Sequence, residues 1–297
     1  MERTVFTAIV GNPNVGKSTL INRLVGSKIA ITSHKPQTTR NRILGVVTKE
    51  DVQYVYLDTP GYHVPRTKLG EYMQKTVRET LEGTDVALFI VCPKPDFDEN
   101  EGKLIEQLKK RGAPVVLAVN KIDTVVDEQR IFEYTESLNK DSFFSKVVLI
   151  SALKNRGLKE LEEAVTCFAK DGPFMFDRDE LTDIPEKVIV SELIRECLLK
   201  FLSDELPHGT AVIIDGFKER TNGDIIDIDA TIICEKKSHK GMIIGKNGEM
   251  LKKIASQARI NAESFLGCRV NLKCWVKIRE GWRDKDSLLR DIGIYGR

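Results

Sequence analysis

The sequence predicts an α/β chain in two parts, a doubly wound and largely parallel sheet followed by a smaller α+β domain. Before residue 152, five short runs rich in Val, Ile and Leu each end in a polar loop, and most are separated by amphipathic stretches, which is typical of alternating strands and helices. A polar segment with two prolines, 171–186, interrupts this pattern. The length of 297 residues fits two domains, since a domain takes about 150 residues.

The first part contains the five predicted strands and four predicted helices. The strands are 5–10, 52–57, 86–91, 115–119 and 147–150, and the helices are 17–25, 69–81, 102–110 and 158–169. Ligands of such sheets bind outside the carboxyl ends of the strands. We therefore expect four loops to converge on one site, namely 11–18, 58–61, 120–123 and 151–153.

The second part follows the order helix, strand, strand, helix, loop, helix, strand. Its best-marked elements are a helix at 186–201, strands at 210–216, 225–234 and 269–278, and a helix from 249 to about 265. Asn222-Gly223 fits the turn of a hairpin between the first two strands. We expect domains at 1–172 and 186–297, joined by a linker at 173–185.

Composition excludes several classes of protein. Hydrophobic residues make up 41% and charged residues 30%, which is typical of a folded chain rather than a disordered one. The apolar runs are shorter than the roughly 18 residues that span a bilayer, and the N-terminus lacks a secretory signal, so we expect a cytoplasmic protein. The six cysteines form no Cys-x-x-Cys pair, so neither a disulfide framework nor a zinc site is indicated.

Charge is distributed unevenly although the net charge is only +2. Residues 231–297 carry 15 basic and 7 acidic side chains, whereas 176–230 carry 6 and 14. An excess of positive charge in one region suggests an anionic partner, most often nucleic acid or a membrane surface, although a solvated face is the simpler alternative.

The segment 11–18 matches the phosphate-binding pattern G-x-x-x-x-G-K-S between a predicted strand and a predicted helix. It consists of Gly11, Asn12, Pro13, Asn14, Val15, Gly16, Lys17 and Ser18, and Thr19 follows. In this pattern the backbone amides wrap the phosphates, the lysine reaches the terminal phosphates and the serine ligates Mg²⁺. The sequence therefore predicts a nucleoside triphosphate site.

Two further loops extend this site. Asp58-Thr59-Pro60-Gly61 follows a predicted strand, where the carboxylate can hold an Mg²⁺-bound water and the Gly61 amide can contact a γ-phosphate. Asn120-Lys121-Ile122-Asp123 selects the base, because the acceptor-only carboxylate of Asp123 pairs with the N1–H and N2 amino group of guanine and not with adenine. We expect Asn120 to join this loop to the phosphate loop, Lys121 to lie along the base, and Ser151-Ala152-Leu153 to offer an amide to the guanine O6.

These motifs, in this order and spacing, resemble the translation-factor-related GTPases of the Ras-like superfamily. The resemblance implies a threonine in the first switch loop that closes on Mg²⁺ with GTP, which corresponds to Thr39 or, as second choice, Thr38 within Gln37-Thr38-Thr39-Arg40. Tyr62 occupies the position at which many members carry a water-orienting glutamine, and His63 follows. We therefore expect slow intrinsic hydrolysis, with K⁺ held in part by Asn14, or a partner protein, completing the site.

A Gly-x-x-Gly loop lies in the second part, between an apolar turn and a basic amphipathic helix, and resembles that of type II KH domains. In such domains the glycines let a nucleic-acid backbone approach, while an apolar groove accepts unstacked bases. The residues that we expect to contact RNA are Ile243, Ile244, Gly245, Lys246, Asn247, Gly248, Lys252, Lys253 and Arg259.

A GTPase domain followed directly by a KH domain resembles the Era family of bacterial GTPases. The resemblance implies a GTP-driven switch that binds 16S rRNA near its 3′ end, acts in 30S subunit assembly and associates peripherally with the inner membrane face. No feature of the sequence indicates a dimer, so we expect a monomer. The alternatives are a metabolic phosphoryl-transfer enzyme, a passive RNA-binding scaffold with a structural nucleotide, and a GTPase of tRNA modification or membrane remodelling.

Overall fold

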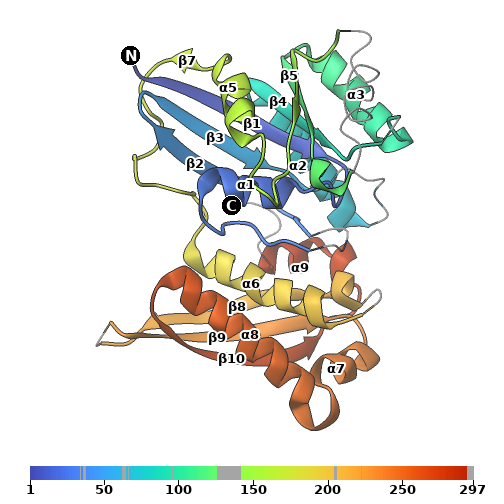
Figure 1. Ribbon diagram of the computed structural model, residues 1–297. Coiled ribbons are helices and arrows are strands. Elements are labelled where there is room, and N and C mark those ends of the chain that lie inside the picture. The colour runs from blue at the N-terminus through green and yellow to red at the C-terminus, as the bar shows by residue number, and fades with distance from the viewer. Residues whose placement is uncertain are drawn as a thin grey trace. The chain divides into compact units, whose positions relative to one another are not determined.

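The computed structural model describes residues 1–33, 35, 38–61, 65, 67–94, 96–125, 142–203, 206–221 and 223–292 (Figure 1). The chain divides into two compact units. Unit 1 comprises Met1–Ala30, Pro36–Val64 and Tyr72–Asp183, and unit 2 comprises Ile31–Lys35, Pro65–Glu71 and Ile184–Arg297. The turn residue Asn222 and the switch-loop residues Gln37, Tyr62 and His63 lie outside the described residues.

Unit 1 is built on a seven-stranded sheet with the order β2-β3-β1-β4-β5-β6, in which β7 also pairs with β1. Five strands run parallel, namely β1 (Arg3–Gly11), β3 (Val52–Asp58), β4 (Val86–Val91), β5 (Val115–Val119) and β6 (Lys146–Leu149). Each of the five predicted runs forms one of them. The predicted doubly wound sheet is therefore confirmed.

Two antiparallel strands were not predicted. β2 (Ile43–Lys49) pairs with β3, and β7 (Lys170–Asp171) pairs with β1. Gly45 lies inside β2, where a Cβ atom would lie 2.7 Å from the Val25 side chain, so the close packing of α1 requires glycine at this position. A glycine weakens the sequence pattern by which a strand is predicted. The predicted helix 158–169 was too long, because it ends at Thr166 and the chain turns into β7.

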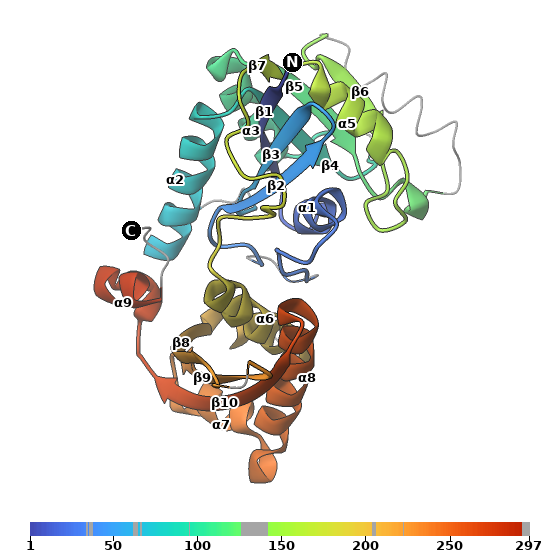
Figure 2. The same cartoon turned by 90° about the vertical axis from the view of Figure 1, so that its left-hand side faces the viewer.

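Helices cover both faces of this sheet (Figure 2). α2 (Lys68–Glu82) and α3 (Glu99–Arg111) pack through Val77 and Leu104 against one face, and α1 (Lys17–Val25) and α5 (Leu158–Thr166) lie on the other. All four helices overlap their predicted ranges. The carboxyl ends of the parallel strands are left for the loops that carry the nucleotide motifs.

The segment that follows β7 is held to this sheet. The side chain of Gln53 accepts hydrogen bonds from the amides of Met175 and Phe176 at 2.8 and 3.0 Å. Thr182 donates to the Leu44 carbonyl at 2.6 Å. The chain up to Asp183 therefore folds with unit 1.

Unit 2 has the predicted element order. It contains α6 (Glu186–Phe201), β8 (Ala211–Glu219), β9 (Ile225–Cys234), α7 (Lys237–Ile244), α8 (Glu249–Leu266), β10 (Arg269–Ile278), α9 (Asp286–Asp291) and the 3₁₀ turns η2 (Leu206–Gly209), η3 (Lys246–Gly248) and η4 (Trp282–Asp284). The sheet order is β10-β9-β8, with β9 parallel to β10 and antiparallel to β8. α6 and α8 lie side by side on one face of this sheet (Figures 1 and 2). β8 runs beyond its predicted end because a bulge between Ile214 and Gly216 lets pairing continue.

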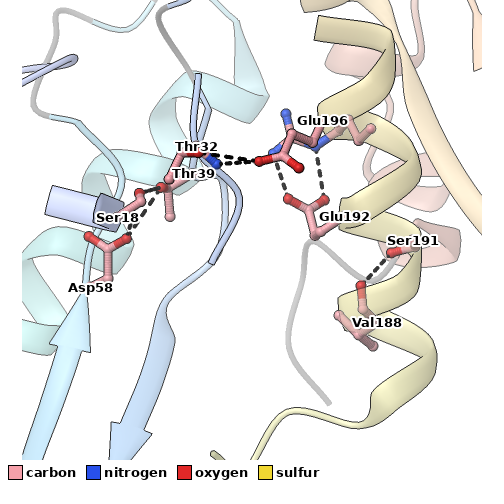
Figure 3. Close-up of polar contacts among 9 residues, drawn as sticks. Ser18, Thr32, Thr39, Asp58, Val188, Ser191, Glu192 and Glu196 are labelled. Atoms are coloured by element: carbon pink, nitrogen blue, oxygen red, sulfur yellow. Dashed lines mark hydrogen bonds and ion pairs between the residues drawn. The ribbon is translucent and has the colours of Figure 1, made fainter. Parts of the chain in front are cut away.

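Two segments from earlier in the chain complete unit 2. The amide and hydroxyl of Thr32 donate to one carboxylate oxygen of Glu196 on α6, at 2.9 and 3.3 Å (Figure 3). The amide of Lys68 donates to Asp284 at 3.2 Å, and its ammonium pairs with Asp286 at 2.8 Å. Among the described residues, no helix is long and apolar enough to cross a membrane.

Candidate functional site

The loop between β1 and α1 has a backbone shape that two glycines make possible. Gly11 has a φ of 150° and Gly16 a φ of 102°, a region that side chains rarely adopt. A Cβ atom would lie 2.3 Å from the Ile90 carbonyl oxygen at Gly11 and 2.3 Å from the Asn120 side-chain nitrogen at Gly16. The loop therefore closes tightly over the ends of neighbouring strands before α1 begins.

Lys17 is buried inside this loop, with 6% of its surface exposed. Its ammonium donates to the carbonyl oxygens of Gly11 and Asn12 at 3.0 and 2.9 Å. Burial lowers the pKa of Lys17 to about 8, while the charge of Asp58 acts in the opposite direction. A buried cation that is held only by two carbonyls and a nearby carboxylate can exchange these carbonyls for phosphate oxygens.

A hydroxyl–carboxylate cluster joins three separate segments (Figure 3). Ser18 Oγ donates to Asp58 Oδ2 at 2.9 Å, and the hydroxyls of Ser18 and Thr39 lie 2.9 Å apart. Thr39 Oγ1 also lies 3.4 Å from Asp58 Oδ2. The arrangement places Thr39 in this cluster and so favours Thr39 over Thr38 as the switch threonine.

The donor set of this cluster fits Mg²⁺. The second carboxylate oxygen of Asp58, Oδ1, is buried and makes no hydrogen bond to any described residue. Burial raises the pKa of Asp58 to about 6, while Lys17 and the two hydroxyls act to lower it. Since Mg²⁺ prefers oxygen ligands and keeps several waters, a buried carboxylate oxygen beside two hydroxyls suits a water-mediated magnesium site.

The loop after β3 approaches the phosphate loop closely. A Cβ atom on Gly61 would lie 2.9 Å from the backbone of Pro13, so any larger residue would push the two loops apart. Thr59, with Pro60 next to it in the buried part of this loop, donates to the Ile9 carbonyl at 2.8 Å. The Gly61 amide is therefore carried beside the segment that is predicted to wrap the phosphates.

The base-selecting loops are joined by Asn120, which is 2% exposed. Its side chain donates to the Val15 carbonyl at 2.8 Å and accepts from the Ala152 amide at 3.0 Å. This one amide group therefore connects the loops after β1, β5 and β6.

Lys121, Asp123 and Leu153 lie around this connection. The Lys121 ammonium donates to the Asn14 carbonyl at 2.6 Å, and the Ser151 hydroxyl donates to Asp123 Oδ1. Leu153 is 61% exposed, and its carbonyl accepts from Arg23 at 3.3 Å. The four predicted loops thus meet at one edge of the sheet.

One contact of this site was missed by the sequence analysis. The Asn12 side chain donates to Asp98 Oδ2 at 2.7 Å, and Asp98 also begins α3 in a capping box with Glu101. Asp98 and Glu101 have the capping spacing in the sequence, which signals a helix start but not its contact with the phosphate loop. The N-terminus of α3 therefore supports this loop.

The glycine loop of unit 2 connects α7 to α8. Gly245 has a φ of 74° and Gly248 a φ of 80°, and a Cβ atom at Gly245 would lie 2.7 Å from that of Met250. Lys246 and Asn247 between them are exposed, as are Lys252 and Lys253 on the first turns of α8. The loop therefore exposes hydrogen-bond donors and cations, while its glycines carry no side chain that would keep a ligand away.

Three of the residues that we expect to contact RNA also have contacts within unit 2. Ile243 is 0% exposed and belongs to the core of unit 2, because the apolar end of α7 turns into the core, and its contact with RNA stays a prediction. Ile244 remains half-buried beside it. Arg259 forms an ion pair with Glu263 at 2.6 Å, which reduces its charge toward a phosphate.

Comparison with known proteins finds relatives for both parts of the chain. Residues 6–121 match the family model described as 50S ribosome-binding GTPase, and residues 205–283 match that of the KH domain. The protein GTPase Era of Thermoanaerobacter sp. (strain X514) is 48% identical over 288 residues, which cover 97% of this chain and 95% of the relative. The chain belongs to the Era family of GTPases. The Era family member of Clostridioides difficile (strain 630) is 44% identical over 293 residues, 99% of each chain.

Solved Era structures share the whole fold. Era of Aquifex aeolicus, a variant bound to GDP and AlF₄⁻, has a TM-score of 0.95 and 34% identity, over 98% of this chain and 99% of that one. A second Era structure, in complex with MgGDPNP and nucleotides 1506–1542 of 16S ribosomal RNA, also has a TM-score of 0.95, with 33% identity over 99% of each chain. This Era-family chain is a GTP-binding and GTP-hydrolysing enzyme, and the predicted fold, a Ras-like GTPase domain with a C-terminal KH domain, is confirmed.

Proposed function

We propose that this GTPase is a molecular switch that binds the 3′ end of 16S rRNA through its KH domain and acts in assembly of the 30S subunit. The observation that carries the switch is the position of Thr39, a residue of the predicted first switch loop, in hydrogen-bonding contact with both Ser18 and Asp58. The solved relative with MgGDPNP and 16S nucleotides supports the choice of RNA. The hydrolysing part would be 1–172 and the RNA-binding part 186–297, joined by 173–185.

In the nucleotide site, Mg²⁺ would be held by the hydroxyls of Ser18 and Thr39 and, through water, by Asp58. When bound, the ion neutralises charge on the β- and γ-phosphate oxygens. Lys17 would turn from its two carbonyl partners to the terminal phosphates, and the Gly61 amide would donate to the γ-phosphate. Loss of the γ-phosphate would free the loops of Thr39 and Gly61, since the γ-phosphate and its Mg²⁺ would hold both loops in part.

In the base site, Asp123 would accept from the N1–H and amino group of guanine. The contacts of Asn120 and Lys121 with the phosphate loop support this role, because they fix the Asp123 loop against the segment that holds the phosphates. The Ala152 amide already donates to Asn120 and the Ser151 amide to the Arg156 carbonyl, so the O6 contact would come from the Leu153 amide.

We further propose K⁺ as an activator, with Asn14 among its ligands. Asn14 lies in the phosphate loop and has a φ of 65°. Its carbonyl accepts a hydrogen bond from the Lys121 ammonium. The test is the hydrolysis rate in KCl and in NaCl at equal ionic strength, for the wild type and Asn14→Ala. A rate that is indifferent to K⁺ and unchanged in Asn14→Ala would remove this proposal.

The same proposal includes a monomer with peripheral attachment to the inner membrane face. The excess of basic side chains in 231–297 supports attraction to an anionic surface. Sedimentation of the purified protein, and its flotation with anionic vesicles, measure the two properties separately.

In the main test, the wild type and Gly248→Asp are each loaded with GDP or with a non-hydrolysable GTP analogue and crosslinked to RNA in cell lysate. The RNA that copurifies with each protein is then sequenced. We expect enrichment of the 16S 3′ end, stronger with the analogue, because a switch must bind RNA with different affinities in its two states. The Gly248 variant should lose this RNA. Equal recovery in both states would favour a passive scaffold.

A matched variant separates RNA contact from backbone strain. Gly112 ends α3 with a φ of 70°, and no atom lies within 4 Å of its Cβ position, as at Gly248. Gly112→Asp therefore adds the same charge and a similar strain outside the KH domain. It should retain RNA binding while Gly248→Asp loses it.

A further inference from the structure

The edge strand β10 presents a face that the helices of unit 2 do not cover. Its alternate residues Val270 and Val276 point into the core beneath α7 and α8. The residues between them point the other way, because successive side chains of a strand alternate. This outward row consists of Arg269, Asn271, Lys273, Trp275 and Lys277, and four of the five are exposed. No described strand pairs with the outer edge of β10.

Trp275 stands out in this row. It is 47% exposed, whereas the other tryptophan, Trp282, is 0% exposed and donates to the Gly209 carbonyl at 3.0 Å. No hydrogen bond or ring contact joins Trp275 to another described residue. A large aromatic ring with a free face, on a rigid strand, is suited to stacking on a planar ligand.

The charge of this row is positive. Arg269, Lys273 and Lys277 form no ion pair with any described residue. The acidic residues near the row are Asp227 and Asp229 of β9 and Glu263 of α8. Asp227 is held by Arg220 at 2.7 Å and by Asn271 at 2.7 Å and also feels the charge of Lys273, while Asp229 lies next to Lys273 in the strand register. Glu263 pairs with Arg259 at 2.6 Å and feels the charge of Arg269.

The end of β10 lies close to the start of α7. The thiol of Cys234, the last residue of β9, lies 3.8 Å from the Lys236 carbonyl and 3.6 Å from the Lys277 carbonyl. Lys236 directly precedes α7, which leads to Gly245. A nucleic-acid strand that follows α7 from the glycine loop would therefore reach the end of β10 that carries Lys277.

We propose that the outward face of β10 is a second site for single-stranded RNA, in which a base stacks on Trp275 and the flanking phosphates contact Lys273 and Lys277. Proteins that bind single strands combine stacking aromatic rings with a basic track in this way. In β10 the three residues are spaced at i, i+2 and i+4, so the ring lies between two cations about 7 Å away along the strand. This inference rests on the proposed RNA-binding function and lengthens its site.

The test compares two RNAs from the 3′ end of 16S rRNA, one of about 6 and one of about 14 nucleotides, because a KH loop grips about four nucleotides and the longer strand alone reaches β10. Both RNAs are titrated into the full-length wild type and into Trp275→Ala. We expect Trp275→Ala to lower the affinity for the long RNA by about 5- to 150-fold, which corresponds to the loss of one stacked base. The affinity for the short RNA should not change. Trp275→Phe should retain most of the affinity.

Lysine variants report on the phosphate contacts. Lys273→Gln and Lys277→Gln should each reduce the salt dependence of long-RNA binding by about 0.7 in log–log slope. Lys218→Gln is the matched control, since Lys218 is exposed on β8 at the opposite edge of the same sheet. It should leave the slope unchanged.

The outcomes separate the two proposals. Failure of the wild type to bind the short RNA would contradict the proposed function itself. Normal short-RNA binding together with equal long-RNA affinity in the wild type and Trp275→Ala would overturn the second site alone. Long RNA should also quench the fluorescence that Trp275→Ala removes, and quenching by anionic vesicles but not by RNA would replace the RNA with a membrane surface.

Discussion

Ser18, the second residue of α1, donates a hydrogen bond of 2.9 Å to Asp58, the last residue of β3, across 40 residues of sequence. Thr39 contacts both of them from a third segment. Two of these residues belong to motifs that can be found in the sequence, whereas the third lies in a loop without a local signature. The cluster therefore connects the proposed magnesium site directly to the first switch loop.

The first prediction concerns the choice between the two threonines of that loop. Thr39→Ala removes a hydroxyl from the cluster and should lower the apparent Mg²⁺ affinity of the GTP-bound protein by at least about tenfold. Thr38→Ala deletes the same atoms one residue earlier and should have a much smaller effect. Mg²⁺ titrations of single-turnover hydrolysis measure both. A larger defect in the Thr38 variant would reverse the assignment.

The second prediction concerns stability against pH without nucleotide or Mg²⁺. Burial raises the pKa of Asp58 from 3.8 to about 6, so between these values the folded state binds more protons than the unfolded state. The free energy of unfolding should therefore fall as the pH rises from about 4 to about 6, by at most about 3 kcal/mol. Asp58→Asn should lack this fall and melt at a higher temperature at pH 7.

Calorimetric melting of both proteins between pH 4 and 8 provides the measurement. Lys17 does not interfere between pH 4 and 6, where the fall is expected, since its pKa is lowered only to about 8. A wild-type profile parallel to that of Asp58→Asn would show that the carboxylate is solvated in the free protein.

The third prediction concerns the base. Asp123→Asn replaces one acceptor oxygen by a donor amide, which opposes the amino group of guanine but complements the C2 carbonyl of xanthine. GTP affinity should fall by about 10²-fold or more, and xanthosine triphosphate should bind in its place. Ser151→Ala removes the hydroxyl that donates to Asp123, so it should lower the affinity for GTP without changing which base is preferred. Competition between the two nucleotides measures both effects.

Much of the fold and of the nucleotide site could be predicted because local patterns and spatial arrangement agree. The parallel strands β3, β4 and β5 are buried on both faces, so they appear in the sequence as largely apolar runs that end at the loops of the site. Asn120 and Asp123 follow such a run, and the sheet places Asn120 beside Val15 without any further information.

The remaining features depend on contacts between distant segments. β2 was missed because Gly45, which makes room for α1, weakens its pattern. The contact between Asn12 and Asp98 joins residues 86 positions apart, and neither residue alone signals it. The burial of Ile243 could not be predicted for the same reason, since only the tertiary fold shows that the end of α7 turns into the core.

The last prediction contrasts two carboxylates of α6. Glu192 holds the guanidinium of Arg195, which is 1% exposed, at 2.9 and 2.5 Å, whereas Glu196 accepts from Thr32 (Figure 3). Glu192→Ala removes the bidentate partner of a buried cation and should lower the free energy of unfolding by up to about 3 kcal/mol. This loss is smaller than for a fully buried ion pair, because the side chain of Glu192 is 31% exposed. Glu196→Ala removes two exposed hydrogen bonds and should cost about 1 kcal/mol or less.

The two variants also differ in where they act. Glu196→Ala should speed hydrogen exchange at the Thr32 amide, which loses its acceptor, while Glu192→Ala should leave that amide protected until the unit unfolds. Glu196→Gln keeps an acceptor oxygen and should restore the protection. Fast exchange at Thr32 in the wild type would show that this residue does not fold stably with α6, whereas the slow exchange that we expect would make Glu196 the residue that holds Thr32 against α6.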